Sequence, residues 1–150
     1  MSCPSGVKIS KDVLLACEDV RMKKNRYVTF HIRPNSNVCT IDKRGDKNST
    51  FQDLKNDLPM NQSRYFVFDC NYLTKESLGN MPRERLLLVH WSPYQKTPCS
   101  TKTIYCASWG AVYKLINRSF GLYKYIEITE PDELSEQKLI ESAAPIIDLL

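Results

Sequence analysis

Apolar and polar residues alternate along this chain with two different periods, and each change of period marks a new element. A first helix is predicted from the candidate N-cap Ser10 to about Met22, where a basic cluster suits a helix C-terminus. Its apolar positions recur at helical spacing: Val13, Leu14, Cys17 and Val20. One face of this helix should therefore pack against the rest of the fold.

Strict alternation begins directly after this helix. Residues 27–33 are predicted to form a half-buried strand. Its inward positions are apolar: Val28, Phe30 and Ile32. The Pro-Asn-Ser-Asn sequence at 34–37 has the composition of a turn, so residues 38–43 should form the second strand of a hairpin. Residues 44–48 are predicted to be a loop.

The middle of the chain holds a short helix and the two most apolar strands. A Thr-Phe-Gln-Asp capping box at 50–53 starts a helix that Pro59 stops. Strands are predicted at residues 64–71 and 86–92, and the second of these is the most apolar and therefore central. Between them, residues 74–82 are predicted to be a polar loop with a Gly-Asn turn.

The last third of the chain adds a long helix, a strand and a final helix. The long helix should span residues 99–117, and a strand should follow at 123–129. The predicted buried face of the long helix carries Ile104, Ser108, Ala111, Val112 and Leu115. Leu134 and Leu139 fit a hydrophobic staple at the start of a helix over 136–144. The order α-β-β-α-β-β-α-β-α predicts an α/β fold with a mixed sheet and helices on both faces.

Length and composition are those of one globular domain, which we expect to comprise residues 1–150. Apolar residues make up 42% of the chain and charged residues 25%, which are ordinary values. No apolar run approaches the ~18 residues of a membrane span, and the first residues lack the apolar core of a signal peptide. We therefore expect a cytoplasmic protein that is small enough to enter the nucleus freely.

The net charge of +4, with a pI near 8.7, limits the classes of partner. This pI lies below the value of about 9 that is typical of a nucleic-acid-binding domain. An acidic protein or an acidic lipid surface would suit a mildly basic chain. The pair Lys23 and Lys24 has two interpretations, a solvated helix end or a site for phosphoinositide lipids.

The cysteines and histidines indicate neither catalysis nor a metal site. The six cysteines include no Cys-x-x-Cys pair, so we expect reduced thiols, several of them buried. His31 and His90 fall inside predicted strands, where we expect each to be hydrogen-bonded within the sheet. No carboxylate has triad spacing to either histidine. The chain is therefore predicted to be no enzyme and to use no metal or other cofactor.

Six short segments occur in a characteristic order. They are Ser-Gly-Val-Lys-Ile-Ser at 5–10, Ser-Arg-Tyr at 63–65, Phe-Asp at 68–69, Arg-Glu-Arg at 83–85, Trp-Ser-Pro at 91–93 and Lys-Thr-Ile-Tyr-Cys-Ala-Ser at 102–108. Together they resemble the actin-depolymerising factor/cofilin family, whose unit is the ADF homology domain, over nearly the whole chain. The resemblance implies a gelsolin-like mixed sheet of five to six strands between helices. It also implies a monomeric protein that binds actin monomers and filaments and promotes depolymerisation and severing.

By position, the resemblance implies two actin-binding surfaces. The monomer surface would combine the N-terminal segment with the long helix: Ser5, Gly6, Val7, Lys102, Thr103, Ile104 and Trp109. The filament surface would use Arg83 and Arg85, which alternate on a strand edge and so can face outward together. For Lys102, Arg83 and Arg85 the alternative is an ordinary solvated charge. Ser5 also stands at the position of the family's regulatory phosphorylation site.

Departures from the family pattern leave alternatives open. Ser100 stands where the family has a second base, and Trp109 and Gly110 stand where it has a lysine and an acid. Trp109 is either packed in the core or an exposed anchor that replaces the missing bases. The final helix carries Glu136 and Glu141 where family members often have bases, so severing is expected to be weak. The alternative is a relative like glia maturation factor or coactosin, which binds filament sides or the branched-filament nucleating complex without severing.

Overall fold

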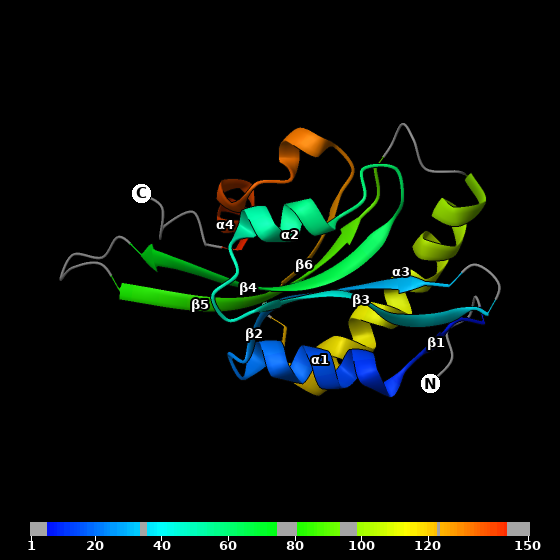
Figure 1. Cartoon of the computed structure of the whole chain (residues 1–150), viewed down its shortest axis with the longest axis horizontal. Helices are drawn as coiled ribbons and strands as arrows, with labels where there is room; N and C mark the ends of the chain where they lie inside the picture. The colour runs from blue at the N-terminus through cyan, green and yellow to red at the C-terminus, as the bar shows by residue number, and fades with distance from the viewer. Residues whose placement is uncertain (1–5, 34–35, 75–80, 94–98, 123, 144–150) are drawn as a thin grey trace.

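The computed structural model describes residues 6–33, 36–74, 81–93, 99–122 and 124–143, and shows a six-stranded sheet with helices on both faces (Figure 1). In chain order the elements are β1 (Lys8–Ile9), α1 (Lys11–Arg21), β2 (Asn25–Ile32), β3 (Val38–Asp46), α2 (Phe51–Asp57), β4 (Arg64–Thr74), β5 (Met81–Trp91), α3 (Cys99–Phe120), β6 (Lys124–Ile128), the 3-10 turn η1 (Pro131–Glu133) and α4 (Glu136–Ala143). The predicted fold class, a mixed sheet between helices, is confirmed.

The sheet is mixed because its inner and outer strands pair differently. The strand order is β1-β3-β2-β4-β5-β6, with antiparallel pairs inside and a parallel pair at each edge. The edge strand β1 was missing from the predicted order, since two residues are too few to show a period. Hydrogen bonds hold it in place: the N–H of Lys8 donates to the carbonyl of Asn37 at 2.9 Å, and that of Ser10 to the carbonyl of Cys39 at 3.0 Å.

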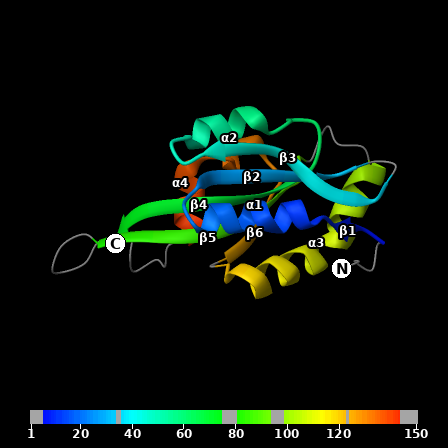
Figure 2. The ribbon, with the colours of Figure 1, turned by 60° about the horizontal axis from the view of Figure 1, so that its bottom comes forward.

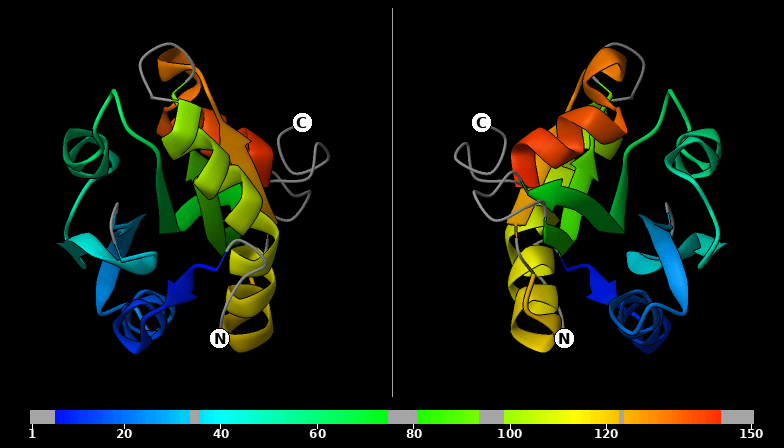
Figure 3. Two further views of the ribbon diagram at one scale, coloured as in Figure 1. Left: turned by 90° about the vertical axis from the view of Figure 1, so that its right-hand side faces the viewer. Right: turned by 90° about the vertical axis from the view of Figure 1, so that its left-hand side faces the viewer.

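Each face of the sheet has its own pair of helices and its own core. Figure 2 looks toward the face covered by α1 and α3, and Figure 3 shows from both ends how the helices surround the curled sheet. The core beneath α1 and α3 includes the three predicted residues of β2, namely Val28, Phe30 and Ile32. Along β4, Tyr65 and Val67 enter this core, whereas Phe66 and Phe68 enter the core beneath α2 and α4. Burial on both faces explains why this strand has a continuous apolar sequence.

The prediction of a loop at residues 44–48 is wrong in its first part, because β3 continues to Asp46. Gly45 is buried within this extension, directly against the ring of Tyr27. A Cβ atom added at Gly45 would overlap that ring, so the glycine serves close packing rather than a turn. The hydroxyl of Tyr27 also donates to Asp57 at 2.5 Å, which ties α2 to the same corner of the sheet.

The predicted loop at residues 74–82 is also too long. β4 extends to Thr74 and β5 begins at Met81, and these two residues pair across the hairpin. The expected Gly-Asn turn at 79–80 lies outside the described residues. The two extensions mix polar and apolar residues without a regular period, and their pairing with each other therefore leaves no signal in the hydrophobic pattern.

The helix boundaries follow the predicted capping chemistry closely. In α2 the capping box is reciprocal: the hydroxyl of Thr50 accepts from the N–H of Asp53 at 3.2 Å, and the Asp53 carboxylate accepts from the N–H of Thr50 at 2.8 Å. Ser10 precedes α1 as predicted, but its hydroxyl makes no capping bond. α3 continues beyond the predicted end to Phe120, where Gly121, with φ of +65°, ends it.

Candidate functional site

Buried hydrogen bonds fix α3 to the sheet. The hydroxyl of Tyr65 donates to the carbonyl of Tyr105 at 2.5 Å, and the Tyr105 hydroxyl accepts from the N–H of Ile32 at 2.9 Å. The predicted buried face is confirmed for Ser108, Val112 and Leu115, whereas Ile104 and Ala111 are half-buried. Tyr105 and Ile116 are also buried and were missed. The side of α3 that faces solvent is thereby fixed as well.

The outward face of α3 is a ridge of mostly small side chains, the α3 ridge: Thr103, Ala107, Gly110 and Lys114. These residues are spaced four, three and four apart, so they lie on one stripe of the helix. Thr103, Ala107 and Lys114 are exposed, and a Cβ atom added at Gly110 would meet no atom within 4 Å. Of these residues only Thr103 was predicted to be functional. Ala107, Gly110 and Lys114 could also have been predicted to be accessible, because they lie outside the predicted buried face of the helix.

Three other predicted monomer-site residues on α3 are less accessible. Lys102 and Ile104 are half-buried on the first turns, and Ile104 packs against the core. The indole of Trp109 stacks on Tyr65, with ring centroids 5.7 Å apart, and lies 5.3 Å from the ring of His90. This packing supports the core interpretation of Trp109 over that of an exposed anchor.

The N-terminal residues of the predicted monomer site divide at Val7. Gly6 is exposed and has φ of +81°, which favours glycine. The side chain of Val7 is fully buried in the core beneath α1 and α3, so it is unavailable for the predicted contact and instead anchors the segment. Ser5 lies outside the described residues. Figures 1 and 2 place β1 and the first turns of α3 at the same end of the molecule.

Arg83 and Arg85 lie at the opposite end of the molecule, on the β4–β5 hairpin (Figure 1). They lie within β5 rather than before it, half-buried and on the same side of the strand as Leu87. β6 pairs with β5 only from Leu87 onward, so among the described residues no strand borders the outer edge of residues 81–86. The prediction that both arginines lie on a strand edge agrees with this geometry.

The hairpin also exposes apolar side chains that the sequence reasoning missed. Leu73 is 61% exposed and Met81 is 47% exposed. Both fall at the ends of strands that were predicted to be shorter, so no signal marked them. Met81 lies on the same side of β5 as the two arginines, whereas Leu73 pairs with Pro82 and lies on the opposite face of the hairpin.

Ion pairs attach the base of the hairpin to α1. The ammonium of Lys23, just after α1, lies 2.7 Å from the Asp69 carboxylate of β4 and 3.1 Å from the Glu84 carboxylate of β5. Asp69 is only 5% exposed, so removal of Lys23 would leave a buried carboxylate without this ion-pair partner. Both lysines of the pair are exposed, and the ion pairs give Lys23 a structural role that neither interpretation of the pair included.

Arg26 makes a second attachment at the same place. Its guanidinium donates to the carbonyl of Asp69 at 2.9 Å and lies 4.8 Å from the centre of the Phe68 ring. It also lies 3.7 Å from the carboxylate of Glu136 in α4. Arg26 therefore joins β2, β4 and α4, and these contacts fix the direction in which the hairpin projects.

The titratable groups of the described residues show no catalytic constellation. Burial lowers the pKa of His90 to about 4, and neither ring nitrogen has a hydrogen-bond partner among the described residues, so the predicted hydrogen bonding of His90 is wrong. Burial raises the pKa of Cys17 and of Cys70 to about 12. The pKa of the exposed Cys106 is also raised, mainly by desolvation, so none of these three thiols is activated.

Two further absences hold within the described ranges. No group of three or more side chains there could hold a metal ion. None of the helices described is both long and apolar enough to cross a membrane.

Comparison with known proteins identifies the family. The model of the cofilin/tropomyosin-type actin-binding proteins matches residues 6–144. The chain belongs to this family. The predicted resemblance is thereby confirmed, and the family consists of actin-binding regulators rather than enzymes.

Individual relatives are distant in sequence and close in fold. Actin-depolymerizing factor 5 of Arabidopsis thaliana is 26% identical over 131 residues, which are 87% of each chain. The structure of Streptomyces griseoflavus cofilin superposes with a TM-score of 0.77 at 22% identity, covering 93% of this chain and 98% of that one. Coactosin from Entamoeba histolytica superposes at 0.73 and 16%, covering 93% and 95%. At these identities the solved structures show that this cofilin-type chain shares their fold.

Proposed function

We propose that this cofilin-type protein binds actin monomers through the α3 ridge and the N-terminal segment, and filaments through the β4–β5 hairpin, and that it promotes filament depolymerisation. Membership of an actin-binding family supports the partner. The observation that carries the two-site assignment is the placement of an exposed helix ridge and a projecting hairpin at opposite ends of one sheet.

The monomer surface is supported by the shape of α3. Small side chains at Thr103, Ala107 and Gly110 let the helix approach a partner closely, as a helix does when it enters a groove. Lys102 is in the first turn, where a positive charge would favour an acidic partner such as actin. We propose Gly6 and Ser5 as further contacts, with Val7 anchoring the segment that carries them.

The filament surface is supported by Arg83 and Arg85, with Met81 as a newly identified neighbour on the same side of β5. We propose that severing is weak, because α4 carries Glu136 and Glu141 where family members often have bases. The alternative function, binding to filament sides or to the branched-filament nucleating complex without severing, is supported by the fold shared with a coactosin.

Further parts of the proposal follow the family resemblance. Residues 1–150 would be a single actin-depolymerising factor homology domain that acts as a monomer in the cytoplasm and at the cytoskeleton, with entry into the nucleus by diffusion. Phosphorylation of Ser5 would add about −1.5 to −2 charges and would repel an acidic partner. Among the lysine pair, Lys24 is the better candidate for phosphoinositide lipids, since Lys23 is held by Asp69 and Glu84.

The test combines filament pelleting with a monomer-binding titration. We expect a dissociation constant in the micromolar range or lower, about −8 kcal/mol, for actin monomers. Lys102→Ala should weaken monomer binding by about 1 kcal/mol and leave the fold intact. Filament binding without monomer binding would favour the coactosin-like alternative, and absence of both at tens of micromolar protein would refute the proposal.

A further inference from the structure

One edge of the sheet is open in the described structure. β6 is the last strand of the sheet, and the N–H of Ser92 donates to the carbonyl of Ile128 at 2.8 Å on its inner side. Alternate residues of a strand direct their backbone groups to the same edge, so the N–H and C=O groups of Ile126 also point toward β5. The N–H and C=O groups of Tyr125 and Glu127 therefore point to the outer edge, where no strand pairs with them among the described residues.

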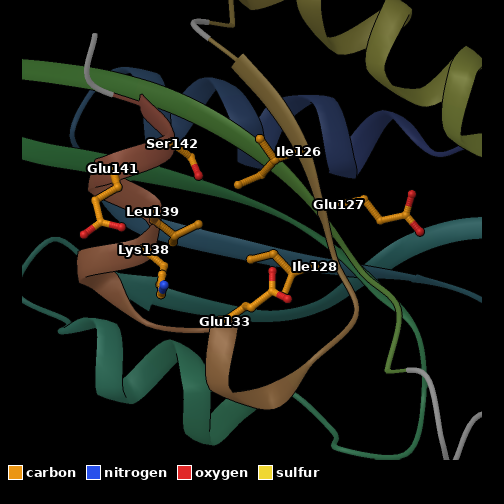
Figure 4. Close-up of a pocket in the computed structure, with 8 residues that line it drawn as sticks. All are labelled: Ile126, Glu127, Ile128, Glu133, Lys138, Leu139, Glu141 and Ser142. Carbon is orange, nitrogen blue, oxygen red and sulfur yellow. The ribbon is translucent and has the colours of Figure 1, made fainter. Parts of the chain in front are cut away.

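A cavity borders this edge on one face of the sheet. It has a volume of about 440 Å³ and lies between β6 and α4 (Figure 4). Ile126, Ile128 and Leu139 give it an apolar floor. The exposed residues Glu133, Glu141 and Lys138 also line it, so its acidic groups outnumber its one lysine. The side chain of Glu127 points to the other side of β6 in Figure 4.

Aromatic rings border the same edge on the opposite face of the sheet. The rings of Tyr113 and Tyr125 are stacked, with centroids 3.9 Å apart and an interplanar angle of 8°. Tyr125 is 44% exposed, and the indole of Trp109 lies 6.2 Å from it. An extended segment added to β6 would thus have a cavity for one set of alternate side chains and an aromatic surface for the other.

The charge around this edge selects the partner. Residues 124–141, from the start of β6, contain six carboxylates and two lysines, a net charge of −4, so the rest of the chain must carry +8 to reach the total of +4. This region would repel an acidic protein and attract a basic one. It is therefore a poor surface for actin, which the proposed function assigns to α3 and the hairpin.

We infer that the outer edge of β6 binds an extended basic segment of a partner protein by strand addition. Backbone hydrogen bonds to Tyr125 and Glu127 would supply affinity. Arginine or lysine stems would lie on Ile126 and Ile128, and their charged ends would reach Glu133 or Glu141. Side chains of the opposite set would rest on the tyrosine stack. This inference is independent of actin binding.

The test uses a short amidated peptide of alternating arginine and valine. We expect it to bind the complete protein and to slow hydrogen exchange of the Tyr125 and Glu127 amides. A peptide of the same sequence with every backbone nitrogen methylated keeps the charge and loses all backbone donors, so it should bind at least about tenfold more weakly. Equal binding of the two peptides, with no change in exchange at β6, would overturn strand addition.

Two matched pairs of substitutions test the charge. Glu133→Gln with Glu141→Gln removes two carboxylates at the cavity and should weaken peptide binding about tenfold. Glu130→Gln with Asp132→Asn removes the same charge from the same acidic run, outside the cavity lining, and should change the affinity less than about twofold. Equal losses in both double variants would show that only the overall field attracts the peptide, and would refute the assigned site.

A third variant tests the backbone directly. Glu127→Pro removes one outward N–H, and an edge strand tolerates proline at such a position, so peptide binding should be lost while thermal unfolding stays close to wild type. If this variant unfolds, the N-methylated peptide makes the same comparison on the unaltered protein. Retained peptide binding by a folded Glu127→Pro protein would contradict the inference.

Self-association of the protein is a separate outcome. If the same variants block it, the edge binds a second copy of this chain, and the inference would also be overturned. Actin binding should stay unchanged throughout.

Discussion

The two ends of the molecule that we assign to actin are held in place by different forces. At the α3 end, buried tyrosines and Trp109 fix the helix, and its outward ridge carries small, mostly uncharged side chains. At the hairpin end, Lys23 and Arg26 fix the strands through ion pairs and hydrogen bonds. The first surface is therefore defined by shape, and the second by charge and by the direction in which it projects.

Because of this difference, the two ends should respond to different changes in solution conditions. Aromatic packing in a dry core is insensitive to salt, whereas partly exposed ion pairs weaken as ionic strength rises. The aromatic end has its own sensitivity, because His90 lies among the rings of Tyr65, Tyr105 and Trp109 without a hydrogen-bond partner among the described residues. Acid should therefore weaken the α3 end first, and salt the hairpin end.

Acidification should produce the largest effect. The pKa of His90 is about 4 in the folded chain against an ordinary 6.5, so protonation favours the unfolded chain. Neutral His90 makes its full contribution to the free energy of unfolding above pH 6.5. This contribution is lost as the pH falls toward 4, by roughly 3 kcal/mol in total. Urea unfolding at pH 7 and at pH 5 should show a clear part of this loss.

The variant His90→Phe identifies the source of that pH dependence. It removes the titrating group and an unpaired buried donor, so the remaining change between pH 7 and pH 5 should be small. The pKa of His31 is also lowered, mainly by burial, and acts in the same direction. A pH dependence in His90→Phe as steep as in wild type would assign the effect to His31 or to other groups.

Ala107→Arg should produce the next largest effect. Ala107 is exposed at the centre of the α3 ridge, so a long side chain there leaves the fold intact but keeps a partner away from the helix. We expect monomer binding to fall by about 2 kcal/mol, roughly thirtyfold, with filament binding through the hairpin less affected. Unchanged monomer affinity would mean that the ridge is not the contact surface.

Arg83→Ala combined with Arg85→Ala should weaken binding at the hairpin end and leave binding at the α3 end unchanged. We expect filament binding to fall about tenfold, or 1.4 kcal/mol, and its salt dependence to become shallower. Monomer binding should stay at the wild-type value in the same preparation. Equal loss of both activities would indicate a wrong site assignment or a damaged fold, which thermal unfolding would distinguish.

The smallest expected effect comes from two adjacent lysines. Lys23→Met removes the partner of the buried Asp69 and should cost about 1 kcal/mol of stability, together with a few-fold loss of filament binding. Lys24→Met makes the same change in charge and composition one residue later, at a side chain with no ion pair among the described residues, and should be nearly neutral. Indistinguishable variants would show that the ion pairs at the hairpin base do not set its direction.

The sequence predicted the elements of this fold well wherever burial is periodic. The inward residues of β2 and the capping box of α2 have strong local signals, and both were predicted correctly. Gly45 was wrongly predicted to lie in a loop. A glycine is needed there because the ring of Tyr27 packs directly against it, and Tyr27 is distant in sequence and belongs to the neighbouring strand. The lengths of β4 and β5 were likewise set by the pairing of residues 72–74 with residues 81–83, two segments without a regular hydrophobic period, rather than by either segment alone.

The candidate site was predictable only in part. Its general location followed from the family resemblance, since Lys102 and Arg83 fall in recognisable segments. The burial of Val7 was not predictable, because it depends on β1 pairing with β3. Lys23 gave no sequence signal of its role, because its two carboxylate partners lie on β4 and β5, far along the chain.

The strand order has a consequence for the way the chain folds. The inner pairs β2–β3 and β4–β5 are hairpins whose partners are close in sequence, and their loops close early and at low entropic cost. The outer pairs β1–β3 and β5–β6 are parallel, and each must wait for an intervening helix to be placed. During synthesis β1 leaves the ribosome first, yet it has no strand to join until β3 has been made. We therefore expect the central strands to nucleate folding, and the N-terminal segment to join the sheet among the last steps.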